Sequence, residues 1–384
     1  MDFELTQEQI MMQKMARDFA EREIVPAARD NDRNERFPSD IVKKMAPLGF
    51  LGGPIPEKYG GPGFDYVSYA VVTEEIGRAC SSVRTVLSVH VSLAGLTILR
   101  WGNEEQKTGY LPDMCAGKKL GCFGLTEPDA GSDPASMSTT AVRDGSDWVL
   151  NGAKMWISNA GVADVAVVFA QTDRSLAHRG IAAFIVDGDS PGYSTRDIHN
   201  KLGLRSSNTG EIIMEDCRVP DRNRLGEVGE GFKIAMSALD HGRFSVAAGC
   251  VGIAQACVDA SVKYARERKQ FGREIGTFQL VQELISEMVV DTEAARLLVY
   301  RAGHLKNKGV RCTREVCIAK YFASEAANRA AYNAIQVHGG YGYSDEYPVE
   351  RYFRDARVAT LYEGTSQIQK LIIGSYALGL KAFT

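Results

Sequence analysis

The residues best suited to chemistry lie near the carboxyl end of the chain, in the segment 361–369. One carboxylate, Glu363, stands there between the aromatic Tyr362 and the flexible Gly364. An aromatic neighbour shields a carboxyl group from water, which raises its pKa toward neutrality, and a glycine lets the backbone pass close to a ligand. A carboxylate in such surroundings can remove a proton from the carbon beside a carbonyl. Glu363 is therefore a candidate catalytic base.

The same segment has a plainer interpretation. Thr365 is a residue type that caps helices, but the third position after it holds Ile368, where a complete capping box would carry Glu or Gln. Glu363 would then be a solvated side chain ahead of an ordinary helix. Taken alone, the segment favours this interpretation.

Four other motifs accompany this segment. Along the chain they read LTEPDAGSD (125–133), WISN (156–159), RKQFG (268–272) and QVHGG (336–340), and the segment itself contains YEGT (362–365). Together, and over essentially the whole chain, they resemble the acyl-CoA dehydrogenase family. The resemblance implies an FAD-dependent enzyme that desaturates an acyl-CoA thioester between its α and β carbons. In short- and medium-chain members, the YEGT glutamate removes the α-proton while the β-hydrogen leaves as hydride to the flavin N5, and this role falls to Glu363.

The resemblance also implies how FAD is held. Residues in the middle of the chain would cover the isoalloxazine ring with an indole and donate hydrogen bonds to its edge, which gains negative charge on reduction. Residues nearer the end would bind the pyrophosphate and adenosine across a dimer interface. The implied cofactor residues are Phe123, Leu125, Thr126, Ser132, Trp156, Ser158, Arg268, Gln270, Phe271, Gln336, Gly339, Gly340, Thr365 and Gln367. Without the resemblance, Trp156 would be read as a core aromatic and Arg268 as a solvated charge.

Contacts to the CoA thioester follow from the same resemblance. Asp240 and Arg243 match positions that contact the pantetheine and adenine parts of CoA, although the intervening pair 241–242 departs from the more common Lys-Thr. Ser132 and Gly364 match further substrate contacts. The thioester oxygen would be held by the backbone N–H of Glu363 and a flavin ribityl hydroxyl, because charge that builds on that oxygen needs preorganised donors.

Arg84 lies among apolar residues near the start of a predicted helix, so its side chain is either splayed to solvent or buried to meet an anion. The segment 84–89 is similar to the one in which glutaryl-CoA dehydrogenases carry the arginine that binds the distal carboxylate of their substrate. This predicts an acyl group with a second carboxylate, such as glutaryl-CoA or the bulkier benzylsuccinyl-CoA. If Arg84 instead meets a carboxylate of the protein, a short-chain (butyryl-type) or branched monocarboxylic substrate remains. His90, two turns later, is expected to be mainly structural.

The elements that position these residues indicate an α+β chain in three domains. Its 384 residues, 45% apolar and 24% charged, describe a soluble globular protein with more than one core. Helical spacing predicts an N-terminal helical domain over 1–119 and a C-terminal helical bundle over 229–384. Short β-branched runs at 148–150, 165–169, 182–186 and 212–214 predict a small antiparallel β domain over 120–228.

Within the first domain, a capping box at 6–9 begins a helix that runs to Pro26. Prolines and glycines over 37–63 predict a surface loop that joins helices. Helical spacing over 66–99 breaks at 80–82, where Ser81 or Ser82 is the expected cap. Neither a dinucleotide-binding GxGxxG motif nor a P-loop follows a strand, so any cofactor is held in another way.

The composition excludes several classes of function. A net charge of −3 with dispersed basic residues argues against nucleic-acid binding, and no transmembrane span or targeting segment is apparent. This predicts a cytoplasmic protein, or one of the mitochondrial matrix if it is a processed eukaryotic chain. Eight cysteines without a CxxC pair or a histidine at metal spacing are expected to be reduced and mostly buried, with no metal.

Two further expectations rest on the resemblance: a homo-oligomer, most simply a homotetramer, and reoxidation of the flavin by electron-transferring flavoprotein. Two other classes remain open. A catalytically idle relative would use the fold as an assembly or acyl-CoA-binding module, and would lack flavin. An acyl-CoA oxidase would consume oxygen, but such oxidases usually carry an additional C-terminal domain that is not expected here.

Overall fold

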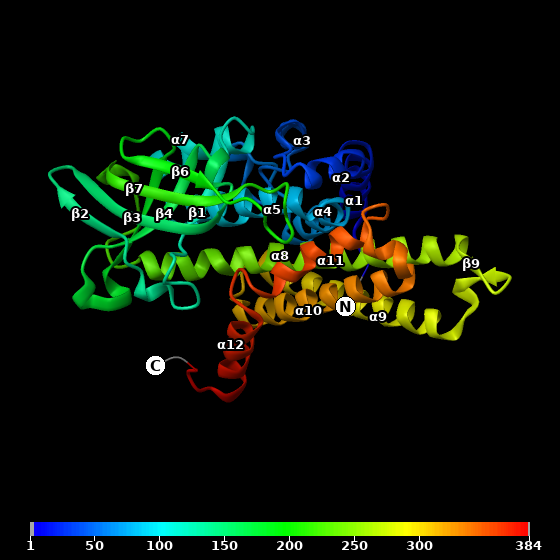
Figure 1. Cartoon of the computed structure of the whole chain (residues 1–384). Coiled ribbons are helices and arrows are strands. Elements are labelled where there is room, and N and C mark those ends of the chain that lie inside the picture. Colours follow the sequence, from blue (N-terminus) through cyan, green and yellow to red (C-terminus); the bar gives the residue numbers. More distant parts are fainter. Residues whose placement is uncertain (1–3, 383–384) are drawn as a thin grey trace.

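The computed structural model describes residues 4–382, which form an N-terminal group of helices, a middle β sheet and a C-terminal bundle of long helices (Figure 1). This arrangement confirms the predicted α+β fold. Two stretches, Ser81–Trp101 and Gly231–Glu267, have the length and hydropathy of membrane spans. However, 94% and 78% of an apolar 18-residue segment within each are buried inside the protein. All eight cysteines are buried and none is in a disulfide, as expected.

The N-terminal helices begin with the predicted capping box, in which Thr6 and Gln9 exchange side-chain to backbone hydrogen bonds of 3.0 and 3.2 Å. The helices are α1 (Gln7–Phe19), α2 (Val25–Arg33), α3 (Ser39–Met45), α4 (Tyr66–Ala79), α5 (Ser81–Ser88), α6 (Leu96–Trp101) and α7 (Glu104–Cys115). The prediction that helix ends at Pro26 is wrong. The helix runs on from α1 through a π-helical turn, Ala20–Ile24, into α2, and Pro26 lies directly after that turn, where the regular pattern of helical hydrogen bonds is already interrupted.

The Pro- and Gly-rich stretch 37–63 is not simply a surface loop. It contains α3, and Phe50 and Leu51 are fully buried in the core. Gly49 and Gly53 take the positive φ values of 75° and 48°, which turn the chain sharply enough to carry these side chains inward. The break near residue 80 is confirmed, but Cys80 rather than a serine occupies the N-cap position of α5.

The middle domain is an eight-stranded sheet with the order β6-β7-β3-β2-β4-β5-β8, and β1 pairs in parallel with β4. Each predicted strand lies inside an observed one, and most pairs are antiparallel. The strands are β1 (Gly121–Gly124), β2 (Thr140–Asp144), β3 (Asp147–Ser158), β4 (Val165–Gln171), β5 (Ile181–Asp187), β6 (Tyr193–Asp197), β7 (Thr209–Pro220) and β8 (Arg224–Leu225).

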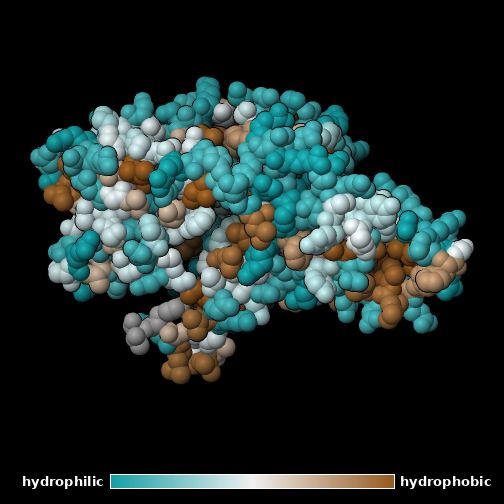
Figure 2. All heavy atoms as spheres, viewed as in Figure 1, coloured by the Kyte–Doolittle hydropathy of each residue, from teal (hydrophilic) through white to brown (hydrophobic). Residues whose placement is uncertain are grey.

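The C-terminal domain is built on one helix of 37 residues, α8, which packs against α4, α5, α9, α10 and the sheet (Figure 1). A short hairpin and α12 project from the bundle, and Figure 2 shows hydrophobic side chains gathered on both. The elements are α8 (Gly231–Glu267), β9 (Lys269–Gln270), β10 (Arg273–Glu274), α9 (Gln279–Asn307), α10 (Thr313–His338), α11 (Val349–Arg357) and α12 (Ser366–Leu378).

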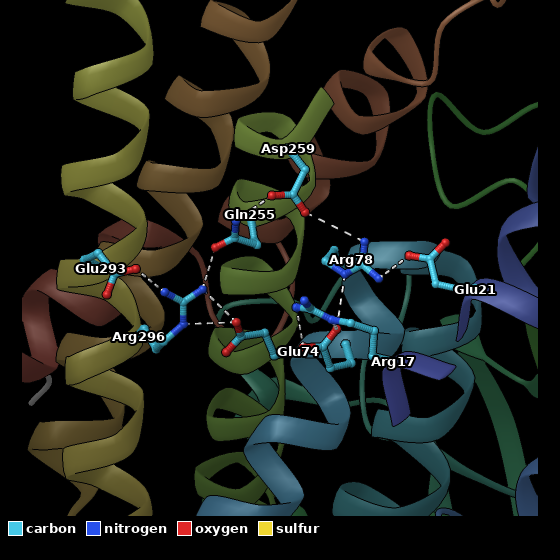
Figure 3. Close-up of polar contacts among 9 residues, drawn as sticks. Arg17, Glu21, Glu74, Arg78, Gln255, Asp259, Glu293 and Arg296 are labelled. Carbon is cyan, nitrogen blue, oxygen red and sulfur yellow. Dashed lines mark hydrogen bonds and ion pairs between the residues drawn. The ribbon is translucent and has the colours of Figure 1, made fainter. Parts of the chain in front are cut away.

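Buried ion pairs join α4 to its neighbours (Figure 3). Glu74 of α4 accepts from Arg296 of α9 at 2.8 Å, and Arg296 also contacts Gln255 of α8 at 2.7 Å. The backbones of α4 and α8 lie so close that a Cβ on Gly252 would stand 2.2 Å from the Glu74 carbonyl oxygen. These contacts fix α4, and therefore the start of α5, against α8.

Candidate active site

Glu363 sits in a turn between α11 and α12 whose backbone is held from one side. Glu363 and Gly364 have φ values of 56° and 83°, a strained conformation for the glutamate. The Glu363 carbonyl accepts from Arg243 Nε and Gln369 Nε2, both at 3.1 Å. The Gly364 carbonyl accepts from Lys320 Nζ at 2.8 Å and from Gln369 Nε2 at 2.9 Å. Four hydrogen bonds therefore fix the direction in which Glu363 points.

The Glu363 carboxyl group lies against Gly242 of α8. A Cβ at position 242 would stand 2.4 and 2.5 Å from its two oxygens, so only glycine leaves room for it. The residue as a whole is partly exposed, but its Oε2 atom is buried and has no hydrogen-bond partner among the described residues. Burial raises the pKa of Glu363 to about 7, against the opposing charges of Arg243, Lys320 and Arg84. The plainer interpretation, in which Glu363 is a solvated side chain ahead of a helix, does not fit this environment.

Arg84 is 1% exposed, which excludes a side chain splayed to solvent. Its guanidinium crosses Gly249 of α8, where a Cβ would stand 2.4 Å from Nε. Nη2 donates to the Tyr362 hydroxyl at 2.7 Å, while Nε and Nη1 are buried without partners. Over residues 4–382, no carboxylate lies within 4.0 Å of its nitrogens. The expected alternative, a pairing with a carboxylate of the protein, does not occur among these residues.

A row of buried hydroxyl groups continues from Arg84. Ser88, one turn later on α5, lies 2.6 Å from Ser245 of α8. Ser245 lies 3.3 Å from the Tyr69 hydroxyl, which is 3.0 Å from Ser92. Sequence reasoning missed this row, although the spacing of 84 and 88 places both residues on one helix face.

The predicted CoA contacts Asp240 and Arg243 lie beside the turn. Asp240 accepts from Arg243 Nη1 at 3.2 Å and from Thr313 at 2.6 Å. Arg243 is 4% exposed, and its buried guanidinium donates hydrogen bonds to both the Glu363 carbonyl and Asp240. Ser132 lies on the exposed loop between β1 and β2. These placements bring three of the predicted substrate residues, Asp240, Arg243 and Gly364, close to Glu363.

His90 is structural, as expected. Its Nδ1 accepts from the Gly121 N–H at 3.0 Å and its Nε2 lies 3.1 Å from the Met114 carbonyl. An acceptor role at Nδ1 leaves the proton on Nε2. Burial lowers the pKa of His90 to about 4, so the ring is neutral and ties the N-terminal helices to β1.

Trp156 stands on an irregularity of β3. The pairing of β3 with β7 shifts register between Lys154 and Ile157, and Trp156 has a φ of 62° and is 62% exposed. The Thr126 loop is joined to this point because its carbonyl accepts from the Met155 N–H at 2.8 Å. An exposed indole beside a fixed loop of donors suits a planar ring.

Neighbouring groups fix this loop further. A buried ion pair of 2.8 Å joins Glu127 to Lys154, and Glu127 also accepts from the Thr139 N–H at 3.0 Å. Of the other residues predicted here, Phe123 and Leu125 pack their side chains into the core, while Ser158 is partly exposed at the end of β3.

The second predicted cofactor group lies at the other end of α8. Arg268, Gln270, Gly339 and Gly340 line one pocket of about 510 Å³, and a Cβ on either glycine would meet nothing within 4 Å. The open glycine backbone and an arginine suit a pyrophosphate. Phe271 in the adjoining hairpin is 95% exposed with a φ of 52°.

The remaining predicted cofactor residues lie near helix ends. Gln336 is exposed near the end of α10, Thr365 caps α12 through Ile368 at 3.3 Å, and Gln367 is exposed on the first turn of α12. Figure 1 shows the hairpin and the sheet at opposite ends of α8, which is roughly 55 Å long at 1.5 Å per residue. The two predicted cofactor groups are therefore separated along the chain's longest helix.

Family models match nearly the whole chain. They are the acyl-CoA dehydrogenase N-terminal domain over residues 6–118, the middle domain over 122–217 and the C-terminal domain over 229–378. An acyl-CoA dehydrogenase of Bacillus subtilis (strain 168) is 48% identical over 98% of this chain and 99% of its own length. A mitochondrial short-chain specific acyl-CoA dehydrogenase of Mus musculus is 47% identical over 98% and 91%.

Several solved structures are also similar to this chain over nearly its whole length. The glutaryl-coenzyme A dehydrogenase in its glutaryl-CoA complex has a TM-score of 0.96 and 44% identity, covering 99% of this chain and 98% of that one. Butyryl-CoA dehydrogenase from Megasphaera elsdenii has a TM-score of 0.96 and 41% identity over 98% and 100%. A chain from work on the electron transferring flavoprotein of Acidaminococcus fermentans has a TM-score of 0.97 and 44% identity over 98% and 100%.

Proposed function

Because the chain belongs to the acyl-CoA dehydrogenase family, and is thus an FAD-dependent oxidoreductase, we propose that it desaturates an acyl-CoA whose acyl group carries a second carboxylate. Glutaryl-CoA is the simplest such substrate, and a substituted succinyl thioester such as benzylsuccinyl-CoA is a bulkier one. The observation that carries the proposal is the buried Arg84, which has no carboxylate partner among the described residues.

Glu363 is the proposed base. Its carboxyl group is buried against Gly242 with a pKa raised to about 7, so it can hold a proton taken from a weak carbon acid and still ionise near neutral pH. Tyr362 and the four hydrogen bonds to the turn keep it in one direction. When bound, FAD would supply the acceptor for the β-hydrogen, which leaves as hydride. Trp156, Thr126 and Ser158 are the proposed contacts to its ring.

The backbone N–H of Glu363 is the proposed donor to the thioester oxygen. Among the described residues this N–H makes no hydrogen bond, while the carbonyls of Glu363 and Gly364 are both occupied. A donor that is already oriented stabilises the charge that builds on the thioester oxygen as the α-proton leaves. The strained backbone of the turn is therefore consistent with a catalytic role.

The dicarboxylic substrate follows from the electrostatics around Arg84. A buried guanidinium without a partner is costly, and a ligand carboxylate would pair with it in a charge-assisted, often bidentate contact. The proposed further donors for the same group are the Tyr362 hydroxyl, which accepts from Arg84, and the Ser88 hydroxyl one turn later on α5. A butyryl group would leave this charge unpaired. The short-chain relative supports the alternative, a monocarboxylic butyryl-type or branched substrate.

We propose a homo-oligomer, most simply a tetramer, in which two chains complete each FAD site. The ring contacts near Trp156 and the pocket at Arg268 lie toward opposite ends of α8, so the pocket of one chain would serve the FAD of another. Contacts between subunits could bury apolar side chains that are exposed in the single chain. They are Phe271, Leu280, Val290, Leu378 and Leu380. The similar structure described together with the electron transferring flavoprotein of Acidaminococcus fermentans supports electron-transferring flavoprotein as the electron acceptor.

A panel of acyl-CoAs added without oxygen tests the proposal. Glutaryl-CoA should bleach the flavin faster than butyryl-CoA at equal concentration, and a preference for butyryl-CoA would select the alternative. Absence of flavin from the purified protein would indicate an idle relative, and oxygen consumption during turnover would indicate an oxidase. The proposed compartment is the cytoplasm, or the matrix for a processed eukaryotic chain.

A further inference from the structure

Lys320 is a fully buried lysine without an ion pair. It lies on α10 with 0% exposure, and over residues 4–382 no carboxylate lies within 4.0 Å of its Nζ. Its one hydrogen bond among these residues goes to the Gly364 carbonyl, at 2.8 Å. Buried lysines are rare because desolvation of the ammonium is expensive, so a lysine here calls for a reason.

Packing does not supply that reason. Half of the buried residues of α10 are alanines, among them Ala319, Ala323 and Ala327, whose small side chains let α10 approach α8. An apolar residue would fill the position of Lys320 with less desolvation. The lysine is distinguished only by what its ammonium reaches, which is the turn that carries Glu363.

Resting on the proposed role of Glu363 as base, we propose that Lys320 is a positioning residue whose ammonium holds the Gly364 carbonyl and thereby fixes the turn. The left-handed backbone of Glu363 and Gly364 persists only if its surroundings hold it. Lys320 and Gln369 are the two donors to the Gly364 carbonyl. Without Lys320, the carbonyl would depend on Gln369 alone, which also serves Glu363.

The same ammonium acts on Glu363 through its charge. The charged groups that face Glu363 are Arg243 from α8, Lys320 from α10 and Arg84 from α5, and each favours the ionised carboxylate. Two further titratable groups interact with this cluster. The Tyr362 hydroxyl on the same turn interacts with Arg84 and Glu363, and the Cys250 thiol of α8 interacts with Lys320. Burial lowers the pKa of Lys320 to about 8, so near neutral pH the ammonium remains charged. Its loss would leave burial less opposed and raise the pKa of Glu363 further.

Two variants separate the hydrogen bond from the charge. Lys320→Met removes both, while Lys320→Gln removes the charge and keeps an amide donor. The measurement is the rate of anaerobic flavin bleaching by a good acyl-CoA substrate from pH 5.5 to 9. In both variants the acid limb should move up by about one pH unit, and in Lys320→Met the limiting rate should also fall by about tenfold. Binding of the acyl-CoA and the FAD content should change little.

Lys306→Met is the matched control, because Lys306 is another largely buried lysine, but its ammonium contacts His241 rather than the turn. It should leave the acid limb in place. The inference is overturned if the acid limbs of the Lys320 variants coincide with that of the wild type. If Lys320→Met loses FAD or unfolds, Lys320→Gln alone decides the point. The two proposals fail in different ways. Flavin bleaching by Glu363→Gln would contradict Glu363 as the base, whereas an unshifted acid limb in the Lys320 variants would contradict only the role of Lys320.

Discussion

The Arg84 guanidinium donates a hydrogen bond of 2.7 Å to the hydroxyl of Tyr362, the residue next to Glu363. This contact joins α5 to the turn of the proposed base across 278 positions of sequence. A ligand group that draws Arg84 therefore also acts on the chain segment that holds the base. Recognition of the acyl end and proton removal are expected to be coupled.

Replacing Glu363 by Gln should abolish reduction while leaving binding intact. The amide has nearly the same size but cannot accept the α-proton, so the anaerobic bleaching rate should fall by at least about 100-fold. Acyl-CoA binding and FAD content, followed by titration and absorbance, should stay close to wild type. In the wild type, kcat/KM should rise with pH up to about 7, because only the ionised Glu363 acts as a base. Substantial bleaching by the variant would place the base elsewhere.

Replacing Arg84 by Ala should remove selectivity for a second carboxylate. Because the substitution takes away one partner of a buried charge pair, kcat/KM for glutaryl-CoA should fall by at least about 100-fold. Butyryl-CoA, which cannot form the pair, serves as the internal control and should lose far less. Arg84→Met repeats the comparison without emptying the site. An equal loss for both substrates would mean that Arg84 supports the fold rather than recognition.

Replacing Tyr362 by Phe tests the coupling between these two residues. The substitution keeps the ring beside Glu363 and removes one hydrogen bond to a charged group, which corresponds to a loss of about tenfold in kcat/KM for glutaryl-CoA. The same loss should not appear in an Arg84→Ala background, because the contact is already gone. Additive effects in the double variant would contradict the coupling.

Replacing Arg268 by Ala should lower FAD retention and weaken the oligomer together, because bound cofactor stabilises only the assembled form. The measurements are flavin absorbance after gel filtration and sedimentation at several protein concentrations. Arg266→Ala, an exposed arginine in the last turn of α8, is the matched control and should change neither. A monomer that retains FAD normally would rule out the shared site.

His90 makes stability depend on pH. Its pKa is lowered to about 4 in the folded protein from an ordinary value near 6.5, so the unfolded chain binds the proton more readily. The stability that the neutral ring contributes is complete above about pH 6.5 and is lost as pH falls toward 4, by on the order of 3 kcal/mol. Urea unfolding from pH 7.5 to 4.5 should show a steeper decline for wild type than for His90→Gln. Parallel curves would contradict this.

The strands, the long helices and the break near residue 80 could be predicted because each follows from local spacing and turn residues. The burial of Phe50 and Leu51 could not, since the glycines that carry them inward look in sequence like those of an exposed loop. The local pattern does not predict the outcome at Pro26 either, because a helix can continue past a proline where a π-helical turn interrupts its regular hydrogen bonds.

The candidate site divides in the same way. Glu363 and Trp156 can be found from their motifs, but the missing partner of Arg84 is visible only when every neighbouring element is in place. The role of Gly242 has no local signal in the sequence, and the structure supplies one, because the Glu363 carboxyl group occupies the space of a side chain there. Lys320 has no local signal in the sequence, because the carbonyl to which it donates belongs to Gly364, 44 positions away.

Gly242 and Gly249 lie seven residues apart on α8, beneath the carboxyl group of Glu363 and the guanidinium of Arg84. If Glu363 and Arg84 act as proposed, the two helical turns between these glycines set a separation of about 10.5 Å along α8 between the base and the group that would bind the far end of the acyl chain. This separation is set by backbone rather than by flexible side chains. One residue inserted between the two glycines would rotate one of them by about 100° around the axis. On the same proposal, exchanging side chains around Arg84 would change which end group is accepted, whereas accepting an acyl group of another length would require a change in α8 itself.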